Sequence, residues 1–339
     1  MRKEEILKEQ IAHFDMSSFN AVNMMEQFEN MAFQARNLSN AAKIYDKMLA
    51  DKDCSIILCM AGSLFSAGLK KIVYDMINCN MIDAIVSTGA LIVDQDFFEA
   101  LGFRHYKGHP KANDDVLMKK QIDRIYDTYI SEEELRICDF TIAEIADSLD
   151  PRPYSSREFI KEMGKYLEAK GPKAESVVHL AYKKNVPIFV PAFSDCSAGF
   201  GLVYHQWNRK DQPKVSIDSV KDFLELTRVK IESPRTGLLM LGGGTPKNFA
   251  QDITVAAEIL GKDTGMHEYA IQITVADERD GGLSGSTLQE AHSWGKVTNE
   301  MEQMVFSEAT LALPLLASYA FHKQTWKHRN AKELAKVLD

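Results

Sequence analysis

Six short apolar runs occur along the chain, and each has the length of one buried strand. They cover residues 55–60, 83–88, 187–193, 237–241, 269–275 and 304–307. Apolar runs of this length that end in Gly, Ser, Thr or an acid and lead into a helical pattern are typical of β-α units. Their repetition predicts an α/β fold with an open, mostly parallel sheet that is covered by helices on both faces.

The first fifty residues show a helical rather than a strand period. They contain neither Gly nor Pro after Met1, and their apolar side chains recur at three- and four-residue steps. This pattern predicts a helical N-terminal segment over 1–50, with Ser18 and Ser39 as the N-caps of successive helices.

The middle and the end of the chain are also predicted to be rich in helix. Residues 100–182 form a mainly helical insertion in this interpretation, and Ser131 and Glu134 have the spacing of a capping box. Residues 321–339 are predicted as a polar, charged terminal helix. We expect residues 1–339 to form one cofactor-binding domain.

Composition limits the classes of function. The chain has 339 residues, of which 45% are hydrophobic, and its net charge is −8, so a soluble globular protein is expected and a nucleic-acid partner is not. The N-terminus lacks an apolar signal core and no run of about 18 apolar residues occurs. We therefore expect a cytoplasmic protein that has no membrane partner.

Neither the cysteines nor the histidines indicate a metal site. The five cysteines are odd in number and lack paired metal-ligand spacing, which favours free thiols in a reducing compartment. His105 and His109 are four residues apart, but Gly108 and Pro110 disfavour the helix that would bring both onto one face.

Small and polar residues follow four of the predicted strands. Residues 61–68 contain two glycines and two serines, Thr88 and Asp195 stand at or just beyond later strands, and 242–244 are three glycines. The carboxyl ends of parallel strands meet at one edge of a sheet, where open α/β folds bind their ligands. We therefore expect a cofactor there, although helix capping and tight turns are alternatives for each residue alone.

The stretch 280–299 carries the candidate chemistry. It combines four glycines with Trp294 and Lys296. A lysine beside an indole, after a glycine-rich bend, can lose its charge by desolvation and act as an amine nucleophile. The alternative is a surface lysine next to a turn.

Several motifs resemble those of the deoxyhypusine synthase family, over about residues 40–320. The resemblance rests on Glu290-Ala291 before Ser293-Trp-Gly-Lys296, on Pro191-Ala-Phe-Ser-Asp195, on Leu241-Gly-Gly-Gly244 before a helix, and on Ala309-Thr-Leu-Ala-Leu-Pro314. The motifs stand in the family's order and at about its spacing.

This resemblance implies a Rossmann-like, doubly wound fold, NAD as cofactor, and a homotetramer with active sites at the dimer interface. In the family, an amine is oxidised by hydride transfer to NAD, and a lysine takes up the aminobutyl group as an imine. The matching lysine is Lys296, and the matching substrate-binding residues are Glu290, Trp294, Asn248 and His292. The positions implied for NAD are Gly62, Ser63, Ser66, Thr88, Gly89, Asp94, Asp195, Gly242, Gly243, Ser284 and Glu308.

The chain departs from the family pattern at the positions implied for the donor amine. Phe200 and Leu283 stand where the family has aspartates, Asn248 where it has histidine, and Gln272 where it has tyrosine. Near the cofactor positions, Glu308 stands where the family usually has aspartate, and Val275 where it usually has threonine. Because an unpaired buried ammonium costs several kcal/mol, a tricationic donor should fit less well than a shorter amine.

We therefore expect an NAD-dependent aminoalkyl transferase that acts through a lysine imine, with homospermidine-type polyamine synthesis ahead of other reactions. One alternative is true deoxyhypusine synthesis on a lysine of a translation factor, although the lengthened segment 100–150 differs from the pattern that docks a protein acceptor. The other alternative is an NAD-binding protein without turnover.

Overall fold

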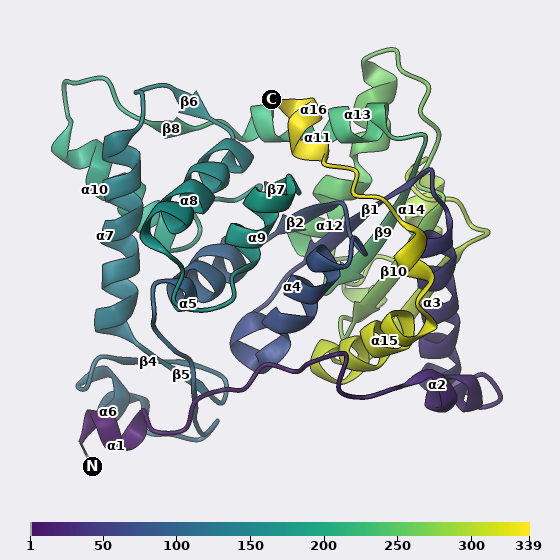
Figure 1. Ribbon diagram of the computed structural model, residues 1–339, viewed down its shortest axis with the longest axis horizontal. Helices are drawn as coiled ribbons and strands as arrows, with labels where there is room; N and C mark the ends of the chain where they lie inside the picture. Colours follow the sequence, from purple (N-terminus) through teal and green to yellow (C-terminus); the bar gives the residue numbers. More distant parts are fainter. Residues whose placement is uncertain (1) are drawn as a thin grey trace.

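The computed structural model describes residues 2–339, and Met1 lies outside the described residues. Its centre is a six-stranded sheet in the order β11-β10-β9-β1-β2-β7, with every neighbouring pair parallel (Figure 1). The strands are β1 (Cys54–Met60), β2 (Ala84–Ser87), β7 (Ile188–Phe189), β9 (Arg235–Leu241), β10 (Tyr269–Thr274) and β11 (Glu302–Phe306). The predicted open parallel sheet is confirmed.

Both faces of the sheet are buried, because the side chains of a strand alternate between its faces. In β1, Ile56 and Leu58 belong to one apolar cluster, and Ile57 and Cys59 to another. Helices α3 (Phe33–Ala50), α4 (Lys70–Asn78) and α15 (Ala309–Lys323) contribute to the first cluster. Helices α11 (Ser219–Glu232), α12 (Gly244–Gln251), α14 (Leu288–Ser293) and α16 (Leu334–Leu338) contribute to the second.

The strand order reverses between β1 and β9. From β1 the chain proceeds outward to β2 and β7, and it then returns to add β9, β10 and β11 on the other side of β1. The carboxyl ends of the two strands at such a switch point diverge into different loops and leave a crevice for a ligand. This topology predicts a ligand site at the carboxyl ends of β1 and β9.

The remaining elements surround this core. The other helices and helical turns are α1 (Lys3–Ile6), α2 (Val22–Phe28), η1 (Phe65–Leu69), η2 (Ala90–Phe97), α5 (Phe98–Ala100), α6 (Asp114–Met118), α7 (Glu132–Ser148), α8 (Ser156–Lys170), α9 (Val177–Lys184), α10 (Ser197–Asn208), α13 (Ile253–Ile259), η3 (Glu278–Asp280) and η4 (Thr325–His328). The short strands are β3 (Tyr106–Lys107), β4 (Ile122–Ile125), β5 (Thr128–Ser131), β6 (Pro153–Tyr154) and β8 (Ser216–Ile217).

The prediction of a helical N-terminal segment over 1–50 is wrong between α1 and α2, where the chain forms no helix. This stretch is extended, and its backbone bonds to distant loops: Ile11 N donates to His105 O, and Phe14 N donates to Gly68 O. Tertiary hydrogen bonds thus replace the helical ones. Neither predicted N-cap holds: Ser39 is buried inside α3, and Asn20, two residues beyond Ser18, accepts from Val22 N at the start of α2.

The middle region contains an antiparallel sheet that the sequence analysis missed. Its order is β3-β5-β4, and β4 and β5 form a hairpin. Ser131 ends β5 and precedes α7, but among the described residues its side chain makes no capping hydrogen bond, so the predicted capping box is wrong. The ladder pairing of Ser131 with Ile122 fixes its backbone instead.

Two other predicted elements are shorter than expected. The run 187–193 gives only the two residues of β7, because Val190 N donates to the Ser156 hydroxyl and Pro191 has no N–H for the ladder. The predicted terminal helix over 321–339 is divided into the end of α15, the turn η4 and α16.

Within residues 2–339, no helix is both long and apolar enough to cross a membrane. The same residues contain no group of three or more His, Cys, Asp or Glu that could hold a metal ion. All five cysteines are free thiols, and four of them are buried.

Candidate functional site

A pocket of about 380 Å³ opens at the carboxyl ends of β1, β9, β10 and β11, where the topology predicts a ligand. Five of the residues predicted for the cofactor line it, namely Gly62, Gly242, Gly243, Ser284 and Glu308. Gly62 and Gly242 have φ angles of +91° and +75°, which are unfavourable for residues with a side chain. The floor of this pocket is therefore bare backbone.

Close packing of two loops requires glycine in this floor. A Cβ on Gly243 would lie 2.4 Å from the Cα of Ser284. The buried Gln272 side chain holds the two loops together, because its Nε2 lies 2.9 Å from Gly242 O and 3.0 Å from Ser284 O. Sequence reasoning had treated Gln272 only as a departure in an amine site, whereas it fixes the shape of this pocket.

The other predicted cofactor residues lie along the same sheet edge, at the ends of β1 and β2 and beyond β7. Ser66 is buried, and its hydroxyl donates to Ser63 O at 2.8 Å, so this pair stabilises the turn after β1. A Cβ on Gly89 would lie 2.4 Å from Cys196 Sγ. Thr88 Oγ1 is buried without a hydrogen-bond partner among the described residues.

Two acids accompany Thr88. Burial raises the pKa of Asp94 to about 6, while the backbone N–H of Ser197, 2.8 Å from Asp94 Oδ1, opposes that rise. Asp195 is exposed beyond β7. The structure therefore divides the predicted cofactor residues into a glycine-lined pocket and a polar group beside it, and both face the carboxyl edge.

A second pocket, of about 500 Å³, lies beside the first and is lined by residues of α11 to α14 and the loops between them. Among the predicted substrate residues, Asn248, Glu290 and Trp294 line it together with Lys296. Leu283 and Ser286 belong to the loop whose Ser284 lines the first pocket. One loop thus forms a wall of both pockets.

Lys296 is largely buried, and its side chain is 13% exposed. Its Nζ lies 2.6 Å from Asp252 Oδ1, 3.4 Å from Asn248 Oδ1 and 5.3 Å from the centre of the Trp294 ring. Trp294 itself is 65% exposed. The indole thus lies near the lysine, as the sequence predicts, but the carboxylate of Asp252 is closer.

Asp252 escaped the sequence analysis. It follows Asn248 by four residues, so the helical turn after the triple glycine places both side chains on one face. Asn248 Nδ2 donates to Asp252 Oδ2 at 2.8 Å, which closes a network of three side chains around Lys296 Nζ. The four-residue spacing was the only signal for this acid.

Lys247 is a second lysine that sequence reasoning missed. It is buried, and its Nζ donates to the Ser286 hydroxyl at 2.9 Å and to the Ser286 carbonyl. Burial lowers its pKa to about 8; Glu290 opposes this change, and Lys296 adds to it. Lys247 thereby ties α12 to the loop that the two pockets share.

His292 does not line the second pocket among the described residues, contrary to the prediction. Its Nδ1 lies 2.8 Å from Val297 O, so that nitrogen carries the hydrogen and supports the turn that holds Lys296.

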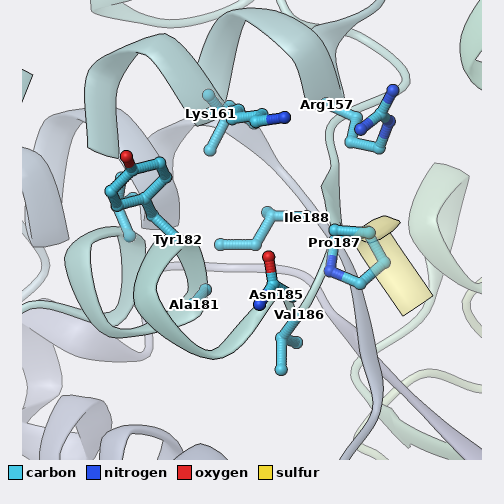
Figure 2. A pocket seen from close by; sticks show the side chains of 11 residues that line it. Arg157, Lys161, Ala181, Tyr182, Asn185, Val186, Pro187 and Ile188 are labelled. Atoms are coloured by element: carbon cyan, nitrogen blue, oxygen red, sulfur yellow. The ribbon is translucent and has the colours of Figure 1, made fainter. Parts of the chain in front are cut away.

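A cavity of only about 30 Å³ between α8, α9 and β7 is not a candidate site (Figure 2). Pro187 and Ile188 stand at the amino end of β7, opposite the edge at which open α/β sheets bind ligands. The side chains around it, among them Val186, Ile188 and Ala181, are mostly apolar.

Comparison with known proteins assigns the family. The model of the deoxyhypusine synthase family matches residues 23–320. A deoxyhypusine synthase-like protein of Chlorobaculum parvum is 63% identical over the whole chain and 97% of its own length. This chain belongs to the deoxyhypusine synthase family.

Two further comparisons agree with this assignment. A protein of Methanosarcina acetivorans named probable deoxyhypusine synthase 2 is 42% identical over 96% of this chain and 92% of its own length. A crystal structure assigned to a deoxyhypusine synthase of Entamoeba histolytica superposes with a TM-score of 0.61 at 19% identity, over 92% of this chain and 97% of that one. The latter likeness concerns the fold alone.

The residues that depart from the family pattern lie in different parts of the structure. Leu283 lines the pocket of Lys296, whereas Phe200 lies on α10 and is 63% exposed. Helix α10 packs against α7 at one end of the molecule, and α14 lies at the other (Figure 1). Phe200 therefore does not contribute to the lysine pocket of its own chain. Glu308 caps α15 by accepting from Thr310 N at 2.8 Å while it lines the first pocket.

Proposed function

We propose that this protein transfers an aminoalkyl group between amines, with Lys296 as the nucleophile that carries the group as an imine. The observation that carries this proposal is the position of Lys296 Nζ on the wall of a 500 Å³ pocket, one loop away from the glycine-lined sheet edge. Membership of a family of transferases supports it. A lysine amine is a suitable nucleophile for an imine carbon.

The residues at the sheet edge fit NAD. Glycine backbone at the switch point allows the close approach that a pyrophosphate needs. Thr88 Oγ1, which has no partner among residues 2–339, and the carboxylates of Asp94 and Asp195 offer hydrogen bonds to ribose hydroxyls. We propose that one part of the cofactor is held by Gly62, Gly242, Gly243 and Ser284. The other part is held by Thr88, Asp94 and Asp195. When bound, NAD supplies a hydride acceptor for amine oxidation.

A small amine is the favoured donor. Glu290 lines the pocket without an ion-pair partner among residues 2–339, while Asp252 is paired with Lys296. One available carboxylate suits a donor with one ammonium group deep in the pocket, and Leu283, Phe223 and Val255 suit its methylene chain. We therefore propose polyamine chemistry of the homospermidine type.

A protein lysine is the second candidate acceptor. Ile259, Leu283 and Trp294 line the pocket and are 81%, 47% and 65% exposed, so its mouth has an apolar rim that a protein could cover. The relative named probable deoxyhypusine synthase 2 supports the same alternative.

We further propose a homotetramer with sites at the dimer interface. Helices α7 and α10 present an apolar face that includes Phe140, Phe200, Val203 and Trp207, each at least half exposed. A second copy of the chain would remove this face from water. The free cysteines suit a reducing compartment, and we place the protein in the cytoplasm.

The test is to trap the intermediate. Protein incubated with NAD and putrescine or spermidine, then reduced with borohydride, is expected to gain the mass of an aminobutyl group on Lys296, as located by peptide mass spectrometry. Without NAD, no adduct is expected. NAD binding measured by calorimetry without any adduct would overturn the transferase proposal, and absence of NAD binding would overturn the cofactor assignment.

Donor preference gives a second test. Leu283→Asp adds a carboxylate to the pocket and should raise the ratio of kcat/KM for spermidine to that for putrescine about fivefold, as a partly exposed ion pair of about 1 kcal/mol would. Val116→Asp on α6 is the matched control and should leave the ratio unchanged. If the parent already prefers spermidine by more than about tenfold, the account of the missing carboxylate is wrong.

A further inference from the structure

The contacts of Lys296 Nζ limit where its proton can go. An amino group that attacks an imine carbon must first lose a proton, and the acceptor must lie within hydrogen-bond reach of it, directly or through one water. Among residues 2–339, the side-chain oxygens that form an ion pair or a hydrogen bond with this nitrogen are those of Asp252, at 2.6 Å, and Asn248, at 3.4 Å. An amide oxygen is a far weaker base than a carboxylate, and the nearby Trp294 indole offers only an N–H donor.

The backbone also fixes the position of Asp252. This residue joins α12 to α13: its N–H donates to Asn248 O, and its own carbonyl accepts from Ala256 N, both at 2.9 Å. Its side chain is 30% exposed toward the pocket, and Asn248 Nδ2 holds the second carboxylate oxygen. One oxygen thus faces Lys296 while the carboxylate is prevented from rotating away.

The other charged groups of the pocket have different partners or positions. Lys247 points to Ser286, and among the described residues Glu290 makes no ion pair with Lys296. We propose that Asp252 is a catalytic residue that takes the proton from Lys296 and returns it to the leaving amine. This inference rests on the proposed function, because it assigns the proton transfers of the imine step.

The proton transfers balance as follows. The Asp252 carboxylate takes one proton from the Lys296 ammonium, and the freed nitrogen lone pair forms a bond to the carbon of the protonated donor imine. The C=N electron pair moves to the donor nitrogen, which receives a proton from Asp252 as Asp252 takes another from Lys296 Nζ. The donor C–N bond then breaks and the lysine imine forms. Asp252 finally protonates the departing amine and is again a carboxylate.

A purely ionic role of Asp252 and a role in proton transfer predict opposite effects of its removal on the rate of imine formation. If Asp252 only holds Lys296 as an ammonium, its removal frees the amine and accelerates imine formation. If Asp252 transfers protons, its removal slows imine formation, because enzymic acid–base catalysis contributes about 10²–10⁴-fold to such steps. The sign of the effect therefore separates the two roles.

Butanal is a suitable probe, because it forms an imine with Lys296 without NAD or a donor amine. The rate of borohydride-trapped adduct at Lys296, resolved from other lysines by peptide mass spectrometry, is expected to fall about a hundredfold in Asp252→Asn. Asp252→Glu should recover part of the rate. Asp263→Asn, a change on an exposed loop, is the control for a general charge effect.

Chemical rescue tests whether the Asp252 carboxylate itself transfers the proton. In Asp252→Ala, added formate should restore part of the rate with saturation, whereas formate should not change the parent. An Asp252→Asn rate equal to or above that of the parent overturns the inference, and so does a slow Asp252→Ala that formate does not rescue. Because the probe requires neither NAD nor a polyamine, these outcomes are independent of the trapping experiment on the proposed function.

Discussion

Replacement of Lys296 by arginine is expected to lower formation of the transferred product by at least about a thousandfold, because nucleophile removal has effects of this size or more. A guanidinium stays protonated at any working pH and cannot form the imine. It keeps the positive charge that pairs with Asp252, so the shape of the pocket and NAD binding should be retained. Product is measured by mass spectrometry and NAD binding by calorimetry.

The matched control is Lys262→Arg, on an exposed loop after α13, which should leave turnover unchanged. If Lys296→Arg turns over at the parental rate, another nucleophile carries the group. If the variant loses both turnover and NAD binding, the change acts on the folded site as a whole and says nothing for imine chemistry.

Replacement of Arg329 by methionine is expected to reduce the free energy of unfolding by about 3–5 kcal/mol. Arg329 Nη2 lies 2.5 Å from Asp83 Oδ2, and the two side chains are 2% and 1% exposed. The guanidinium also donates to the carbonyls of Asn80 and Met48, at 2.9 and 3.2 Å. Its loss leaves a buried carboxylate beside β2, and it leaves these two carbonyls and those of Asp51 and Cys54 without their donor.

The decrease in the free energy of unfolding caused by Arg329→Met should depend on pH. Burial raises the pKa of Asp83 above its usual value, and Arg329 opposes that rise. Without the arginine, the carboxyl binds its proton more tightly in the folded than in the unfolded state, so the folded state gains stability as the pH falls. The destabilisation is therefore expected to be smaller at pH about 5 than at pH about 8.

Urea unfolding curves at the two pH values check this prediction. Arg279→Met, which removes an exposed pair with Asp277, is the control and should cost less than about 1 kcal/mol. The double variant Asp83→Asn with Arg329→Met should recover part of the loss. A cost below about 1 kcal/mol for Arg329→Met would show that water or a rearranged chain replaces the guanidinium.

The elements that the sequence predicts best are those whose environment is uniform along their length. β1 and the second half of β9 are buried and almost entirely apolar because helices cover both sheet faces, and their carboxyl ends carry the glycines that a close backbone approach requires. For the same reason, the sequence alone predicts that Gly62, Gly242 and Gly243 lie at this sheet edge. The N-terminal stretch has helical periodicity too, but hydrogen bonds to residues near 68 and 105 hold it extended.

The candidate site also combines features that the sequence predicts with contacts that only the structure shows. The sequence by itself determined the parallel α/β architecture and the family motifs, one of which contains Lys296, because these depend on apolar runs, glycines and short local spacings. Only the tertiary structure decided the neighbours of that lysine: Asp252 and Asn248 come from a segment more than forty residues earlier, and Phe200 lies on a distant helix. Contacts across such separations depend on how helices pack on the sheet, and no local pattern encodes that packing.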